Sequence, residues 1–164
     1  MGPNTVLYQV VLVVHILCAV VGFGSILVTG GYAGAARRVS EDGQVSEAVR
    51  RYFRPGPNLA SRFIYAVPVL GLVMVGMSGG GDLSQSWLWL GSGLWLAAAG
   101  LATAVVWPAE ARIAALVSGA RGAGGSLEVP AAIAQEGRRA SWAAAVMDLA
   151  VTAAFVVMIA RPGG

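Results

Sequence analysis

The sequence predicts an all-α integral membrane protein: a four-helix bundle, N-out and C-out, with short cytoplasmic interfacial helices. Hydrophobic residues make up 57% of the 164-residue chain and charged residues only 12%, whereas an average soluble domain is roughly 25% charged. Four apolar stretches each reach the ~20 residues that cross a hydrocarbon core. We therefore expect one transmembrane domain over residues 1–164, with spans at about residues 5–30, 59–78, 87–107 and 141–160.

The first span carries no basic residue before it and is far longer than the ~7–15-residue apolar core of a secretory signal, so we expect it to be retained. After it, apolar residues at helical spacing from Ser46 to Arg54 predict a short interfacial helix that Pro55 ends. Pro68 predicts a kink in the second span.

The third span is expected to continue past Pro108 to about Val117. A Gly-rich flexible stretch follows over residues 119–126. A helix restarting near Pro130 then runs into the fourth span.

Arginines predict the orientation of the bundle. All eleven basic residues are arginines. Six lie between the first two spans or at the start of the second, four lie between the last two or just before the fourth, and Arg161 follows the fourth; the first ten are at positions 37, 38, 50, 51, 54, 62, 112, 121, 138 and 139. The loop of residues 79–86 has none, so the positive-inside rule places it and both termini outside. The pI of 9.6 then reflects contact with anionic lipid and not with nucleic acid. The all-arginine, Ala/Gly/Val-rich composition suggests a high-GC bacterial source, and we expect the protein in the bacterial cytoplasmic (inner) membrane.

Small and polar residues recur at helical spacing in three spans. They are His15, Cys18, Gly22, Ser25 and Thr29 in the first, Gly93, Ala97, Gly100 and Ala104 in the third, and Ser141, Ala145, Asp148 and Thr152 in the fourth. Small residues let helix backbones approach closely inside a membrane. We therefore expect all three stripes to face the bundle interior.

His15 and Asp148 are the candidate functional residues, because both are expected near mid-bilayer. An ionised acid there costs at least ~2.5–3.5 kcal/mol, so Asp148 needs a partner or water, and His15 is the most economical partner. The pair is either a structural hydrogen bond, a proton-relay step, or a ligand with its orienting residue. Tyr8, Tyr65 and Arg62 could extend a polar path.

Other chemistry is restricted by the residue inventory. One Cys and one His cannot supply the roughly four ligands of a structural zinc site, so no metal site is expected. One Cys cannot form an internal disulfide. Haem stays a candidate with His15 as ligand, paired either with a second chain's histidine or with a methionine at position 74, 77 or 147.

Residues 12–38 carry a partial resemblance to a known family. Val14-His15-Ile16-Leu17, then Val21-Gly22-Phe23-Gly24, then Arg37-Arg38 resemble the first helix of small four-helix bacterial membrane proteins in the copper-resistance protein D-like superfamily. The match is to its branch of predicted integral membrane proteins of unknown function. A related branch, the membrane protoporphyrinogen oxidases, uses a first-helix histidine with haem, which implies that role for His15. This chain has no intramembrane lysine such as those enzymes are expected to supply.

From these features we expect a non-enzymatic accessory or structural subunit of a larger membrane complex, in contact with lipid and with other subunits or further copies of itself. The alternatives are a haem- or quinone-linked redox protein using His15, and a proton or small-solute pathway using His15 and Asp148. No catalytic residue is assigned.

The arginine distribution yields a test of orientation. A cysteine introduced by Ser84→Cys should react with a membrane-impermeant thiol reagent from the outside, whereas Ser46→Cys should react only after permeabilisation. The reverse labelling pattern would contradict the N-out, C-out orientation.

Overall fold

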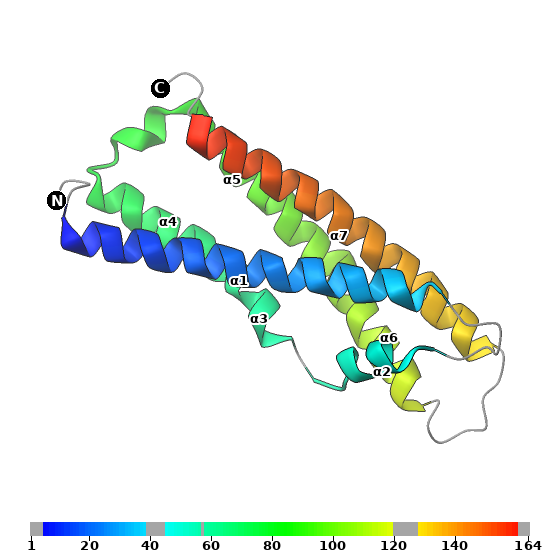
Figure 1. The fold of residues 1–164 in the computed structure, drawn as a ribbon. Helices are drawn as coiled ribbons and strands as arrows, with labels where there is room; N and C mark the ends of the chain where they lie inside the picture. The colour runs from blue at the N-terminus through cyan, green and yellow to red at the C-terminus, as the bar shows by residue number, and fades with distance from the viewer. Residues whose placement is uncertain (1–4, 39–44, 57, 120–127, 161–164) are drawn as a thin grey trace. The chain divides into compact units, whose positions relative to one another are not determined.

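The computed structural model describes residues 5–38, 45–56, 58–119 and 128–160, and within these ranges every regular element is helical (Figure 1). The elements are α1 (Val6–Ala36), α2 (Glu47–Tyr52), α3 (Leu59–Arg62), η1 (Phe63–Tyr65), α4 (Ala66–Met77), η2 (Gly81–Ser84), α5 (Ser86–Leu101), η3 (Ala102–Val106), α6 (Trp107–Gly119) and α7 (Glu128–Ala160). They divide into two compact units. Unit 1 comprises Met1–Ser25, Leu59–Ala99 and Asp148–Gly164, and unit 2 comprises Ile26–Asn58 and Gly100–Met147.

Four helical stretches in the described ranges are long and apolar enough to cross a membrane: Val6–Ala36, Leu59–Met77, Ser86–Gly119 and Ala131–Ala160. This confirms the expected all-α membrane architecture. The first, third and fourth stretches extend beyond the predicted spans at the ends that carry the arginine-rich segments. The extensions are helical because small residues there pack: Ala33 and Ala36 at the end of α1 are buried in unit 2.

The second span is interrupted by the 3₁₀ turn η1, directly before α4. Pro68 has no N–H, so it cannot donate to the carbonyl of Ile64 four residues earlier, as an α-helix requires. The indole Nε1–H of Trp95 on α5 donates to that carbonyl instead, at 3.2 Å. An unpaired backbone group in the hydrocarbon would cost several kcal/mol. The irregularity expected from Pro68 therefore lies one turn before it, and a tryptophan from another helix satisfies it.

The third span continues past Pro108, as expected, and contains the π-helical segment η3 immediately before it. The N–H of Trp107 bonds the carbonyl of Ala102, five residues back. A wider turn makes room for the proline ring, which would collide with the carbonyl four residues earlier in a regular helix. The helix restarting near Pro130 is also found, with α7 beginning at Glu128. The expected Gly-rich stretch lies outside the described residues except for Gly119.

The short helix expected between the first two spans is α2. Ser46 caps it, accepting a hydrogen bond from the N–H of Val49 at 3.4 Å. Its apolar face packs into a buried cluster of unit 2, where Val49 and Phe53 meet residues of α1, α6 and α7. This face is therefore covered by protein rather than by lipid headgroups.

Tyr52 joins α2 to α1 within unit 2. Its hydroxyl shares a 2.6 Å hydrogen bond with Thr29, and its ring stacks on Tyr32 with ring centroids 4.2 Å apart. Burial raises the pKa of the Tyr52 hydroxyl above its ordinary value, against the opposing effect of the Thr29 hydrogen bond. The amide of Asn58 also donates to Thr29, at 3.4 Å. The end of α2 and the segment that follows it thus meet at one threonine of α1.

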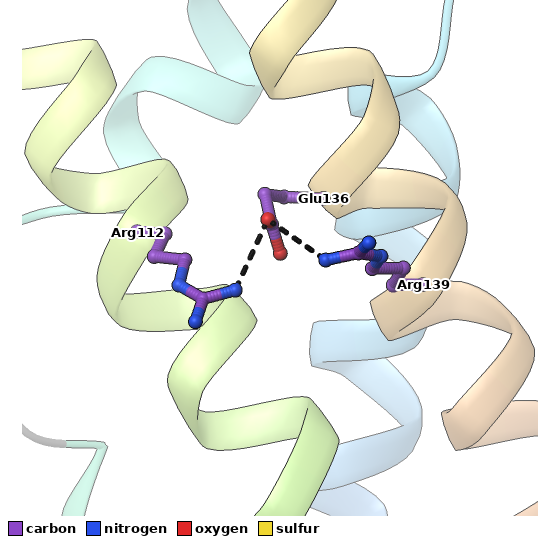
Figure 2. A network of polar contacts seen from close by, with 3 residues as sticks. All are labelled: Arg112, Glu136 and Arg139. Atoms are coloured by element: carbon purple, nitrogen blue, oxygen red, sulfur yellow. Dashed lines mark hydrogen bonds and ion pairs between the residues drawn. The ribbon is translucent and has the colours of Figure 1, made fainter.

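Glu136 links α6 to α7 in the same unit. Figure 2 shows its carboxylate between two arginines, Arg112 of α6 at 3.2 Å and Arg139 of α7 at 3.4 Å. The glutamate side chain is 13% exposed, whereas the arginines are more than half exposed. Solvent screens the arginine ends, so each pair is worth at most about 1 kcal/mol. The two ion pairs therefore contribute little to the stability of the fold.

Glycines bring helix backbones into contact in unit 2. A Cβ at Gly137 would lie 2.6 Å from the carbonyl oxygen of Ala33, and one at Gly30 would collide with Ala144. Gly34 faces Ser141. As residue numbers increase along α1, the numbers of the contacting residues in α7 decrease, so the two helices are antiparallel. The first-span stripe is confirmed in part: Cys18, Gly22 and Thr29 are buried, and His15 and Ser25 are half-buried.

The stripe expected on the third span is wrong. Gly93, Ala97, Gly100 and Ala104 are all exposed, and a Cβ at Gly93 or Gly100 would meet nothing within 4 Å. The buried positions belong to a different face, with Gly91, Ala98 and Ala102. In the fourth span, Ala145 and Thr152 are exposed while Ala144 and Met147 are buried. This span has small residues on several faces, so their spacing alone does not identify the packed one.

These contacts predict opposite outcomes for two glycines of unit 2. Replacing glycine by alanine in a helix normally gains about 0.5–1 kcal/mol. Gly137→Ala should nevertheless destabilise by about 1–3 kcal/mol, because the added methyl group overlaps the Ala33 backbone. Gly100→Ala is the matched control and should leave the melting temperature in detergent unchanged or slightly raised. Equal melting temperatures for the two variants would refute the α1–α7 contact.

Candidate functional site

His15 lies on α1 in unit 1 and is half-buried. The backbone of Val67 lies near its imidazole, and Nδ1 is buried without a hydrogen-bond partner among the described residues. A Cβ at Gly71 would lie 3.6 Å from the imidazole Cε1. The histidine therefore faces the second span, at a point where a glycine leaves room beside the ring.

The register between α1 and the second span explains this placement. A Cβ at Gly22 would lie 2.7 Å from the backbone nitrogen of Ile64, so the two backbones touch there. His15 lies seven residues before Gly22, and Gly71 lies seven residues after Ile64. Seven residues are about two turns in either helix, so antiparallel packing at Gly22 brings His15 opposite Gly71.

Beside the imidazole, unit 1 contains a cavity of about 300 Å³, the lower end of the usual range for ligand pockets. Its lining comes from α1, α4, α5, α7 and the turn before α5. Its lining includes His15, Phe23, Gly71, Ser92, Trp95 and Met158. The other lining residues are apolar, so the cavity suits a ligand that is itself largely apolar.

Helical spacing places the lining side chains. His15 and Ala19 are four residues apart on α1, and Ser92 and Trp95 three apart on α5, so each pair lies on one face. Trp95 is held there by its hydrogen bond to the Ile64 carbonyl. The hydroxyl of Ser92 makes no hydrogen bond with the residues that the structure describes. Ser92 and His15 are therefore the two polar side chains that the cavity can offer to a ligand.

Asp148 lies on α7 in the same unit and is half-buried, but it does not line the cavity. Within the described ranges, no hydrogen bond or ion pair joins it to His15. Their coupling stays a prediction, which non-additive costs in a double-mutant cycle would support.

The residues of the expected polar path are not among the lining residues. Tyr8 is half-buried, and Tyr65 and Arg62 are exposed. A path through them stays a prediction. No group of three or more metal-binding side chains occurs in the described part of the chain.

The cavity fits a haem poorly. Met158 lies on it together with His15, whereas the methionines named from the sequence, Met74, Met77 and Met147, do not line it. An imidazole and a thioether are a known axial pair. However, a tetrapyrrole is much larger than a single ring, and its two carboxylates would find no cationic side chain among the lining residues. The residues present favour a smaller, uncharged ligand.

Of the residues that line the cavity, the sequence singles out His15 but not Trp95, Ser92 or Met158. One signal for Trp95 is in the sequence: this tryptophan lies in the middle of the third span, away from the membrane interfaces where tryptophan usually anchors a helix. Ser92 and Met158 carry no comparable signal, because their role depends on which helices meet at the cavity.

Comparison with known proteins gives one match. The model of a family described as "Predicted integral membrane protein (DUF2269)" matches residues 9–162. No curated protein and no solved structure matches the chain. The family match supports the integral-membrane part of the resemblance described above, whereas membership of the copper-resistance protein D-like superfamily stays a prediction.

The Trp95–Ile64 hydrogen bond yields a double-mutant test. Trp95→Phe should destabilise by about 1–3 kcal/mol, because it leaves the Ile64 carbonyl unpaired. Pro68→Ala provides an N–H that can bond the same carbonyl, so in that background Trp95→Phe should cost about 1 kcal/mol less. Thermal unfolding in detergent measures both costs. Equal costs in the two backgrounds would show that Trp95 does not compensate for the proline.

Proposed function

The chain belongs to the DUF2269 family of predicted integral membrane proteins, and we propose that it binds a small, largely apolar ligand from the lipid phase in the cavity of unit 1. The observation that carries this proposal is the position of His15: an imidazole on the wall of an apolar cavity, within a helix apolar enough to span the membrane. Polar side chains at this depth are costly and commonly mark functional sites.

The energetics of the imidazole support binding. A buried polar atom without a partner costs about 1–3 kcal/mol, and Nδ1 has no partner among the described residues. A ligand with a hydroxyl or carbonyl group could hydrogen bond to the imidazole, while its apolar part filled the cavity. One polar contact would then orient a ligand whose affinity comes mainly from apolar burial.

We place this binding role in a non-enzymatic accessory subunit of a larger complex in the bacterial cytoplasmic membrane. The exposed small-residue face of α5, with Gly93 and Ala97, supports that placement, because such faces permit close helix contact with a neighbouring subunit. The arginine distribution supports the N-out, C-out orientation.

Binding can be tested with aminoanthracene, an apolar fluorescent probe. Gly71→Leu directs a large side chain into the cavity and should weaken binding by on the order of tenfold, or about 1.4 kcal/mol. Gly76→Leu is the matched control, since Gly76 lies on the same helix, has open space around it and does not line the cavity. Saturable fluorescence enhancement that Gly71→Leu does not reduce would refute the proposal. A Soret band in the purified protein would favour haem instead.

A further inference from the structure

We propose that the ligand of this cavity is the ring of a membrane-soluble benzoquinone or its hydroquinone, a proposal that rests on the ligand-binding function above. The first observation is the pair of polar groups. His15 on α1 and Ser92 on α5 line the same cavity from different helices. A ligand that uses both must carry two hydrogen-bonding atoms, and the two ring oxygens of a benzoquinone meet this need.

The second observation is the character of the remaining wall. Four aromatic side chains line the cavity, namely Phe23, Trp89, Trp95 and Phe155. The indole N–H groups of Trp89 and Trp95 are already donated to backbone carbonyls, at 2.9 Å and 3.2 Å. These residues therefore offer ring surfaces rather than further donors, and flat ligands pack well against such surfaces.

The third observation is the absence of charge from the lining. No Arg, Lys, Asp or Glu is among the described residues that form the cavity. A charged ligand would lose its hydration without gaining an ion partner, at a cost of several kcal/mol. A benzoquinone ring is neutral in both its oxidised and its doubly reduced, protonated form.

The chemistry of the two polar side chains suits both forms. A neutral imidazole and a hydroxyl can each donate or accept a hydrogen bond. They can pair with a quinone carbonyl, which only accepts, or with a hydroquinone hydroxyl, which does both. The volume of about 300 Å³ suits one substituted ring. An apolar tail on that ring would remain among the lipid chains.

The test compares decylubiquinone, a short-chain benzoquinone, with decylbenzene, which has a ring and a tail but no oxygen atoms. The affinity of each compound is measured by its displacement of aminoanthracene from the full-length protein in nanodiscs. We expect decylubiquinone to bind more tightly than decylbenzene. His15→Phe and Ser92→Ala should each weaken decylubiquinone binding by about 2- to 10-fold, the value of one hydrogen bond. Neither should change decylbenzene affinity by more than about 2-fold.

Ser118→Ala is the matched control for the serine, because Ser118 lies on α6 outside the cavity and its hydroxyl bonds its own helix. It should leave both affinities unchanged. Ser92→Ala keeps the proposal testable if His15→Phe fails to fold.

Equal affinity of the wild-type protein for decylubiquinone and decylbenzene would overturn the quinone proposal. So would a preference for decylubiquinone that stays unchanged in both His15→Phe and Ser92→Ala. If aminoanthracene binds in a Gly71-dependent manner but decylubiquinone does not displace it, the binding function stands and the quinone assignment fails. If Gly71→Leu changes the binding of neither aminoanthracene nor decylubiquinone, both the binding function and the quinone assignment fail.

Discussion

Close approach of helix backbones at glycine is the constraint on which both units depend. Apolar side chains gain nothing by leaving lipid for one another, so dispersion and backbone contact must hold the helices together. In unit 1, Gly22 lies against the backbone of Ile64; in unit 2, Gly137 lies against the carbonyl of Ala33. A methyl group at either position would occupy space that the neighbouring backbone already fills. These contacts set the helix register, which decides which side chains face each other two turns away.

The His15 cavity follows from that register. The Gly22 contact brings His15 opposite Gly71, where the missing side chain leaves space beside the ring. Pro68 removes one backbone donor from the second span, and the Trp95 indole replaces it. One tryptophan thus satisfies the Ile64 carbonyl and forms part of the cavity wall. An irregular helix can persist at membrane depth because a neighbouring helix satisfies its free carbonyl.

Polar groups are used differently in the two units. In unit 2, α2 buries Val49 and Phe53, Tyr52 bonds Thr29, and Glu136 contacts two arginines. These groups largely partner one another. In unit 1 the polar side chains at the cavity, His15 and Ser92, leave hydrogen-bonding capacity unused among the described residues. This difference supports a structural role for the first set of polar groups and a binding role for the second.

The sequence by itself determined which four stretches are long and apolar enough to span a membrane, the short helix between the first two of them, and the continuation past Pro108. It also singled out His15 as a candidate, whose role stays a prediction. Each depends on local properties: apolar length, helical spacing, or the rarity of imidazole in an apolar segment. Only the tertiary structure decided that Gly91 and Ala98, rather than Gly93 and Ala97, form the buried face of α5. It also decided that Ser92, Trp95 and Met158 share a cavity with His15. When small residues occur on several faces of a helix, the contacts of the neighbouring helices select one of them, and this selection is not encoded in local spacing.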